Sequence, residues 1–303
     1  MNNYSPVVLF VYNRADHLMR TLEALNSNRS ISYATLYVFS DGPKTFDDKA
    51  RVAEVRQLIR RSNNFTATEI SESPVNKGLA TSVIDGVTQV IAKHGQIVVL
   101  EDDVVTSPGW YEFMNGAVNF YKDNPNIWSV GGYCPPINLP ESYPYDVFLS
   151  PMETSYSWGT WMDRWNLIDW EITDFNEFIK DRERVERFCG WKPSRMRLLK
   201  RTMRNKNNSW AVRFGYASAK HSMLSVLPTN SRVTNIGYDK GEHSCSRLEA
   251  SASAKYSAEL DDQPCEFKND MQLSSKIVTA LRDFHHSSTY ARVKHFCSRL
   301  VVR

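Results

Sequence analysis

The stretch "IVVLEDDVVTSP", residues 97–108, runs from four apolar residues directly into Glu101, Asp102 and Asp103. A short continuous apolar run of this kind predicts a strand that is buried on both faces. Adjacent carboxylates repel one another, and each raises the pKa of its neighbours unless a cation or strong hydrogen-bond donors compensate. The acidic turn therefore indicates either a metal ion at the end of a strand, or a helix N-cap or solvated turn.

The chain before this turn alternates between strand-like and helix-like segments. Continuous apolar runs predict most of the strands, and apolar residues at helical spacing predict the helices. In chain order the expected elements are a strand at 6–12, a helix at 14–28, a strand at 34–43, a helix at 49–62, a strand at 67–73, a helix at 78–95 and a strand at 96–103. This alternation predicts an α/β fold with a mostly parallel central sheet and helices on both faces.

Polar clusters follow three of these expected strands. They are "YNR" at 12–14, "SDG" at 40–42 and "EDD" at 101–103. In open parallel sheets, ligands bind outside the carboxyl ends of the strands. The acidic turn is therefore expected on the same edge as the other two clusters, where a binding crevice should lie.

The second half of the chain does not continue the regular alternation of strands and helices. A helix is expected at 109–125 and a short strand at 127–133, followed by a proline-rich loop at 134–146. Segment 155–170 then carries four tryptophans. Tryptophans at this density pack in a core or, beside a polar loop, stack against a sugar ring or a base.

Charge is distributed unevenly. The 303 residues carry a net charge of +3. Residues 1–150 hold 12 Lys and Arg against 16 Asp and Glu, whereas residues 151–303 hold 25 against 18. The basic segment 192–208 predicts either a solvated helical face or an anion-facing surface. The basic, amphipathic segment 276–303 predicts a helix that docks on the fold or lies on an anionic membrane. No nucleic-acid partner is expected, because the basic cluster is poor in aromatic residues.

Nothing in the sequence indicates export. The five cysteines are scattered without a CxxC pair, so reduced thiols are expected. The first apolar run lacks the basic region and cleavage site of a signal peptide. No apolar stretch reaches the about 18 residues of a transmembrane helix. We therefore expect a cytoplasmic protein, with peripheral contact at the inner face of the membrane as the alternative.

Several standard sites are absent from the sequence. It has no GxxxxGK[ST] loop, no GxGxxG after the first strand, no HExxH and no GxSxG. Without a glycine-rich loop, the charge of a diphosphate ligand must be neutralised in another way. Asp and Glu oxygens suit Mg²⁺ or Mn²⁺, and such an ion can bridge a carboxylate and a diphosphate.

The segment "LEDDVVTSPGWYEFMNGAVNFYKDNP" resembles the metal-binding segment of GT-A glycosyltransferases, especially the N-acetylglucosaminyltransferase I-like group with its Glu-Asp-Asp version of the DxD motif. Other stretches match that group in the same order, over roughly residues 6–245: "FVYNRADHLMRTLEAL", "SDGP", "SWGTWMDRW" and "TNIGYDKGEH". The resemblance implies a GT-A fold, a Rossmann-like and mostly parallel sheet with flanking helices, to which a helical C-terminal tail is added.

The resemblance also implies roles for individual residues. Those expected to bind the nucleotide or the donor sugar are Tyr12, Asn13, Arg14, Asp41, Asn76, Lys77 and Asp102. Asp103 would bind Mn²⁺ or Mg²⁺ directly, and His243 would be a metal or phosphate ligand. Each assignment has an ordinary alternative, such as a turn residue for Asp41, a solvated charge for Lys77 and a hydrogen-bonding loop residue for His243.

The sequence departs from the family at the catalytic base. In the animal enzymes this base is an Asp just before a Trp, within Asp-Asp-Trp. The corresponding stretch here is "NNSWAVRFGYA", residues 207–217, with Asn208 and Ser209 in those places. Neither side chain can act as a carboxylate base. Either another carboxylate serves, or the stereochemistry differs.

Two carboxylates flank the tryptophan-rich segment and are candidates for the base. They are Glu153 in "PMETSYSW" and Asp163 in "WMDRW", although Asp163 can equally form an ion pair with a neighbour. Trp158 and Trp161 are the expected acceptor contacts.

Together these features predict a metal-dependent glycosyltransferase, with an inverting mechanism favoured. It would move a sugar from a nucleotide-diphosphate donor, expected to be a UDP-sugar, to a glycan or lipid-linked oligosaccharide acceptor in surface polysaccharide synthesis. Residues 1–108 would form the nucleotide-sugar half, residues 109–245 the acceptor half and residues 246–303 a basic extension.

Two alternatives belong to other classes. A sugar-nucleotide nucleotidyltransferase should have a glycine-rich basic loop after the first strand, where "YNRADH" has no glycine. A non-enzymatic carbohydrate-binding protein would explain the tryptophans but not the acidic triplet.

Overall fold

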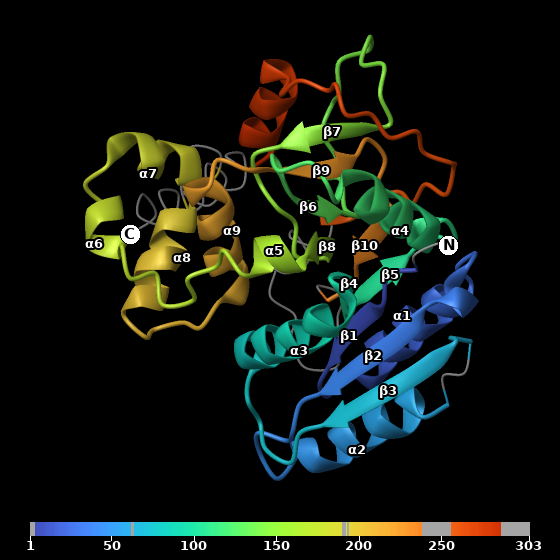
Figure 1. Ribbon diagram of the computed structural model, residues 1–303. Helices are drawn as coiled ribbons and strands as arrows, with labels where there is room; N and C mark the ends of the chain where they lie inside the picture. The colour runs from blue at the N-terminus through green and yellow to red at the C-terminus, as the bar shows by residue number, and fades with distance from the viewer. Residues whose placement is uncertain (1–3, 62–63, 190–191, 193, 238–255, 286–303) are drawn as a thin grey trace, which may run out of the picture.

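A central sheet of eight strands organises the chain in the computed structural model, which describes residues 4–61, 64–189, 192, 194–237 and 256–285 (Figure 1). From one edge to the other, the strands are β3 (Ala67–Glu72), β2 (Thr35–Ser40), β1 (Val7–Val11), β4 (Gln96–Glu101), β8 (Ser157–Trp161), β6 (Ile127–Gly131), β9 (Leu224–Pro228) and β7 (Val147–Ser150). All run in one direction except β8 and β7. The expected mostly parallel α/β sheet is confirmed.

The first half of the sheet follows the predicted alternation. β1 pairs in parallel with β2 and β4, and β2 pairs in parallel with β3. The connecting helices are α1 (Ala15–Asn26), α2 (Asp48–Ile59) and α3 (Leu79–His94). In the β1–β4 register, Phe10 lies beside Glu101. The acidic turn after β4 is therefore next to the segment that follows β1.

The second half contains strands that the sequence patterns do not predict. β8 lies between β4 and β6 and is antiparallel to both. Ser157 pairs with Leu100 and Trp161 pairs with Gln96, so β8 begins at the carboxyl edge of the parallel strands and ends at the opposite edge. The strands without a sequence signal are β5 (Val104–Thr106), β7, β8, β9 and β10 (Val233–Asn235). They are short, and they pair with partners distant in sequence, so periodicity could not reveal them.

Helices cover both faces of the sheet (Figure 1). One apolar core joins the sheet to α1, α2 and α4 (Trp110–Tyr121). A second core, on the other face, joins it to α3, α5 (Met162–Trp165) and α9 (Trp210–Lys220). The sheet is thus buried between two layers, as the apolar character of β1 and β4 predicts.

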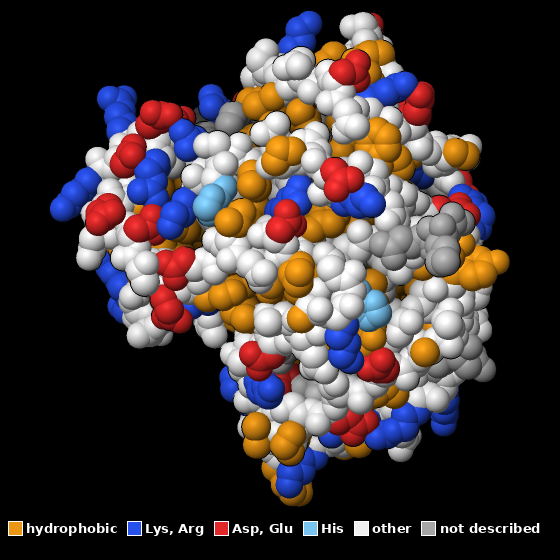
Figure 2. Space-filling model, in the orientation of Figure 1, with side chains coloured by type: hydrophobic (Ala, Val, Ile, Leu, Met, Phe, Trp, Pro, Cys, Tyr) orange, Lys and Arg blue, Asp and Glu red, His pale blue; other side chains and the backbone are white. Residues whose placement is uncertain are grey.

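The helices α6 (Phe175–Phe178), α7 (Arg182–Cys189) and α8 (Ser194–Met203) pack beside α9 as a helical lobe with its own small core. Of the basic residues on α8, Arg195 is buried and the others are exposed. Figure 2 shows Lys and Arg mixed with Asp and Glu over this lobe. On this face, the helical segment therefore fits the solvated alternative better than an anion-facing one.

The C-terminal segment returns to the sheet. Residues 275–285 are helical. Ile277 and Leu281 are buried and pack with Phe148 of β7 and Leu227 of β9. This part of the tail docks on the fold, and residues 286–303 lie outside the described part. No helix among the described residues is both long and apolar enough to cross a membrane.

Candidate functional site

The acidic turn lies at the carboxyl end of β4, directly beside the end of β1. The guanidinium of Arg14 is 2.5 Å from a carboxylate oxygen of Asp102 and 3.0 Å from one of Asp103. The backbone amide of Tyr12 also donates a hydrogen bond to Asp102, at 3.2 Å. Both aspartates are buried, with exposed fractions of 3% and 8%. An arginine and a backbone amide from the segment after β1 therefore provide part of the compensation that the carboxylates need.

Arg14 does not compensate all three carboxyl groups of the turn. Burial, and after it the charges of Asp103 and Asp102, raises the pKa of Glu101 to about 8, although Arg14 lowers it. Burial also raises the pKa of Asp102 by more than the pairing with Arg14 lowers it. Burial lowers the pKa of Arg14, but the two aspartate charges outweigh it and the pKa is raised overall. One guanidinium thus faces three carboxyl groups.

A two-stranded ribbon forms the other wall of the turn. β5 pairs antiparallel with β10, which places Asn235 beside Val104. The Asn235 side-chain amide donates to Asp103 at 3.2 Å, and the backbone amide of Ile236 donates to the carbonyl of Asp103 at 2.8 Å. Segment 234–243 was expected near the nucleotide, and its first residues do reach the acidic turn. His243 lies outside the described residues.

Asp41 and Asn76 join two loops at the same edge of the sheet. The carboxylate of Asp41 accepts hydrogen bonds from the backbone amides of Gly42 and Lys77, each at 2.8 Å, and of Gly78 at 2.9 Å. The Asn76 side-chain amide donates to the carbonyl of Gly42 at 2.8 Å. The observed contacts of both residues are to the protein backbone. The ammonium of Lys77 is 3.2 Å from Asp85 on the exposed side of α3.

Tyr12 and Asn13 contact the start of α2. The Asn13 side-chain amide donates to Asp48 at 2.8 Å, and the backbone amide of Lys44 donates to the Tyr12 hydroxyl at 3.1 Å. Hydrogen bonds from Thr45 and then from Asn13 lower the pKa of Asp48 to about 2. Asp48 therefore stays ionised and holds this loop against the end of β1. Sequence reasoning placed it next to a helix start and gave no sign of this role.

The two candidates for the base lie at opposite edges of the sheet. Glu153 precedes β8 and is therefore on the carboxyl edge with the acidic turn. Asp163 follows β8 at the opposite edge, where its exposed side chain pairs with Arg164. The expectation that Asp163 frames the acceptor is not supported, because β8 is antiparallel and carries it away from the turn.

Glu153 is tied to the helical lobe. Its Oε1 atom is 2.7 Å from the guanidinium of Arg195, and both side chains are about nine-tenths buried, with 11% and 8% exposed. Its Oε2 atom is buried and has no hydrogen-bond partner among the described residues. Gly215 of α9 lies directly beneath, since a Cβ there would be 2.1 Å from Oε1. Arg195, inside a segment expected to be a solvated basic face, is therefore a partner that sequence reasoning missed.

Trp158 and Trp161 are core residues. Their exposed fractions are 1% and 4%. Trp158 stacks on Trp165 and Trp210, with ring centroids 6.0 and 5.0 Å apart. The Trp161 indole donates to the carbonyl of Val118 at 3.0 Å. Neither side chain is accessible to an acceptor in this structure, because β8 is buried on both faces of the sheet.

The residues of the turn fit a hard divalent cation. Among the described residues, no three His, Cys, Asp or Glu side chains form a ready ligand set. Mg²⁺, however, is usually held by one or two carboxylates, and waters and substrate phosphates complete its coordination. Asp103 offers one carboxylate, which in the described part of the chain contacts the Arg14 guanidinium and the Asn235 amide. No hydrogen bond in the described part of the chain uses the Glu101 carboxylate.

Comparisons with known proteins give a partial likeness of fold. No protein-family model matches the chain, and no curated protein sequence matches it. Among solved structures, the mannosyltransferase PcManGT from Pyrobaculum calidifontis, in complex with GDP-Man and Mn²⁺, matches 53% of this chain and 46% of its own, at 13% identity and a TM-score of 0.34. TarS from S. aureus matches 75% of this chain and 36% of its own, at 10% identity and a TM-score of 0.40. The matches span less than half of either structure, so the function has to be argued from the site.

Proposed function

We propose that this protein is a glycosyltransferase that uses a nucleotide-diphosphate sugar, with a UDP-sugar as the expected donor. The observation that carries the proposal is Arg14 held between Asp102 and Asp103 at the carboxyl edge of the sheet. This pairing brings a cationic group and carboxylates to the place where parallel sheets bind ligands.

Different residues of the site would contact or position different parts of the donor. The Arg14 side chain is 38% exposed, so its guanidinium, although paired with Asp102 and Asp103, would be within reach of the diphosphate. Asp102, fixed by Arg14 and the amide of Tyr12, would contact the ribose or the donor sugar. Asp41 and Asn76 act by holding the loops around Gly42 and Lys77 in place as the wall beside the base. In this assignment Asp41 does not hydrogen-bond the uracil or the ribose directly. It positions the loops that would contact the nucleoside.

A divalent metal ion would be held by Asp103, with the Glu101 carboxyl group beside it. When bound, it would neutralise the charge that develops on the leaving diphosphate. Glu153 is our remaining candidate for the base that deprotonates the acceptor hydroxyl, because it alone of the two candidates lies on this edge. Its Oε2 atom, which has no hydrogen-bond partner among the described residues, would accept the proton, and this requires the acceptor hydroxyl to reach a largely buried carboxylate.

The carbohydrate-binding alternative loses its main support, since Trp158 and Trp161 are buried. The nucleotidyltransferase alternative still lacks the glycine-rich loop that it requires. A lipid-linked acceptor and peripheral contact with an anionic membrane remain proposals that rest on the positive charge of the second half.

The direct test is release of UDP from a panel of UDP-sugars, measured with Mn²⁺ and with or without glycan acceptors. We expect release from at least one donor, and we expect Asp103→Asn to abolish it. Asp123→Asn is the matched control, because Asp123 is an exposed aspartate in the turn before β6. Equal turnover by both variants, or turnover only of GDP- or dTDP-sugars, would overturn the assignment of the site or of the donor.

A further inference from the structure

A cavity of about 360 Å³ lies far from the acidic turn, at the opposite edge of the sheet. It opens where β6 and β9 begin, beside Ile127 and Leu224, and the C-terminal segment around Met271 closes it. Its volume is within the range of small-molecule sites, about 300–1,000 Å³. The proposed glycosyltransferase site makes no use of it.

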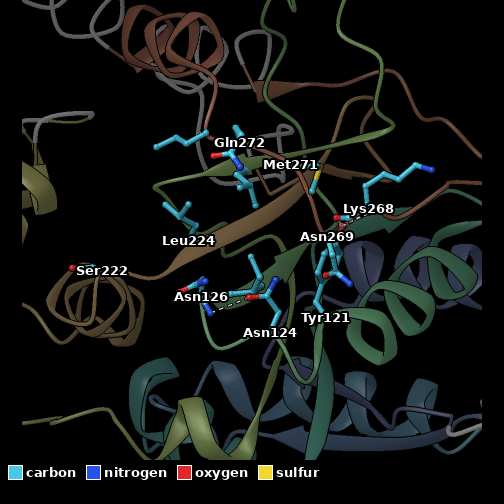
Figure 3. A pocket seen from close by; sticks show the side chains of 12 residues that line it. Tyr121, Asn124, Asn126, Ser222, Leu224, Lys268, Asn269, Met271 and Gln272 are labelled. Atoms are coloured by element: carbon cyan, nitrogen blue, oxygen red, sulfur yellow. Dashed lines mark hydrogen bonds between the residues drawn. The ribbon is translucent and has the colours of Figure 1, made fainter.

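The polar lining of this cavity consists mainly of primary amides. They come from Asn124 and Asn126 before β6 and from Asn269 and Gln272 in the C-terminal segment. Figure 3 shows Asn124 and Asn126 on one side of the cavity and Gln272 across from them. No hydrogen bond in the described part of the chain uses the side-chain amides of Asn126, Asn269 or Gln272. Each amide can therefore both donate to a ligand and accept from it.

Both walls of the cavity are anchored. The carbonyl of Asn124 accepts from the Arg164 guanidinium at 2.7 Å, and the carbonyl of Asn126 accepts from the backbone amide of Leu224 at 2.9 Å. On the other side, the Tyr121 hydroxyl donates to the carbonyl of Lys268 at 2.8 Å. Both amide-bearing segments are thus held in place before any ligand arrives, which lowers the entropy cost of binding.

The rest of the cavity lining is mainly apolar. Ile127 and Met271 are buried, and Leu149 and Leu224 are half-buried beside them. The charged group in the lining is the ammonium of Lys268, which is already paired with Glu266. A phosphate or carboxylate ligand would find no uncompensated cation here. Paired hydrogen-bond donors and acceptors over an apolar floor match the hydroxyls and C–H face of a pyranose.

We propose that this cavity is a second, non-catalytic site for a neutral saccharide of one or two pyranose units. It goes beyond the proposed function, since binding here requires neither a nucleotide nor a metal ion. In a glycosyltransferase, such a site would hold a distal part of a growing glycan.

The test is a titration of the full ¹⁵N-labelled chain with maltose and, separately, N,N′-diacetylchitobiose, followed through the side-chain amide signals. Up to about 20 mM sugar is enough to detect a millimolar Kd. We expect at least one sugar to shift the signals of Asn124, Asn126, Asn269 and Gln272. Loss of two amide contacts in the double variant Asn126→Ala, Gln272→Ala should raise the Kd at least about tenfold.

Two further variants make the test specific. Gln89→Ala, an exposed glutamine on α3, should leave the Kd unchanged. Asp103→Asn should also leave the Kd for the sugar unchanged, because Asp103 belongs to the proposed donor site. The saccharide proposal can therefore fail or succeed independently of the proposed function. The proposal is overturned if neither sugar shifts these signals, or if the double variant binds as tightly as the native chain.

Discussion

Arg14 contacts Asp102 and Asp103 at once, and that geometry depends on the planar fork of a guanidinium. The sequence presented the three acidic residues and the strand before them, so their need for compensation was predictable. The identity of the compensating group was not. It required the β1–β4 register, which places the segment after Phe10 beside Glu101.

Replacing Arg14 should therefore destabilise the fold. Arg14→Met leaves buried Asp102 without its charged partner, and we expect a loss of about 1–3 kcal/mol in the free energy of unfolding. Arg14→Lys should lose less, because one ammonium can still pair with one carboxylate. Urea unfolding at neutral pH measures both. Unchanged stability in both variants would show that the pairing does not support the fold.

The role of Glu153 can be separated from its structural pairing. Glu153→Gln keeps an acceptor for Arg195 but removes the carboxylate, so we expect sugar transfer to fall by about 10²–10⁴-fold while the Kd for UDP stays the same. Asp163→Asn is the matched control and should transfer normally, since Asp163 is exposed at the far edge. If Glu153→Gln transfers at the native rate, the base lies elsewhere.

Secondary-structure elements explain which parts of the site could be predicted. Strands β1, β2 and β4 have apolar runs, and β1 to β4 are regularly separated by helical segments, so their order and shared edge followed from the sequence. The β5–β10 ribbon and β8 are short and pair over long sequence distances. Because these strands were not predicted, no role was assigned to Asn235. For the same reason, Asp163, Trp158 and Trp161 were expected beside the acceptor, whereas Asp163 lies at the opposite edge and both tryptophans lie in the core.

The ribbon should be essential for donor binding. A Cβ at Gly237 would lie 2.1 Å from Oδ2 of Asp103, too close without displacement of the carboxylate. We expect Gly237→Ala to weaken metal-dependent UDP binding about tenfold or more, equivalent to about 1.4 kcal/mol, while the unfolding midpoint changes little. Titration calorimetry measures the Kd. Native affinity in this variant would place Asp103 outside the donor site.

The helical lobe should become less stable in acid. Burial raises the pKa of Asp174, but hydrogen bonds from Arg184, Tyr216 and Lys220 outweigh it, so the pKa is lowered. A carboxyl group whose pKa is lower in the folded chain than in the unfolded chain stabilises the fold at pH values above its unfolded pKa, about 3.9 for Asp. This stabilisation is lost as the pH falls through the folded pKa. The difference in unfolding free energy between the native chain and Asp174→Asn should therefore shrink as the pH falls from neutral to below 4. A constant difference would contradict the linkage.

At the scale of the whole molecule, one sheet presents two unlike edges. The carboxyl edge carries the acidic turn, and the other edge carries the amide-lined cavity. The alternation of strands and helices was enough to predict the first edge. The second could not be predicted, because segments 121–127 and 268–273 meet only after the C-terminal segment crosses back over α4, where Phe267 packs against Tyr121.

The same packing should protect the thiols. Burial raises the pKa of Cys134 to about 12, and burial followed by the charge of Asp146 raises that of Cys265 to about 12. Since the thiolate is the reactive form, we expect iodoacetamide at about pH 8 to label both at least about a hundredfold more slowly in the native chain than in concentrated guanidinium chloride. Peptide mass spectrometry reads each cysteine separately. Rapid native labelling of Cys134 would show that its core is open.

The central claim is that the acidic turn binds a nucleotide diphosphate together with a metal ion. The most direct measurement is a calorimetric titration of UDP into the purified chain, with Mn²⁺ and with the metal chelated, repeated with Asp103→Asn. We expect binding that requires Mn²⁺ and disappears in the variant, while Asp123→Asn behaves as the native chain. Metal-dependent UDP binding that survives Asp103→Asn, or no UDP binding under either condition, would contradict it.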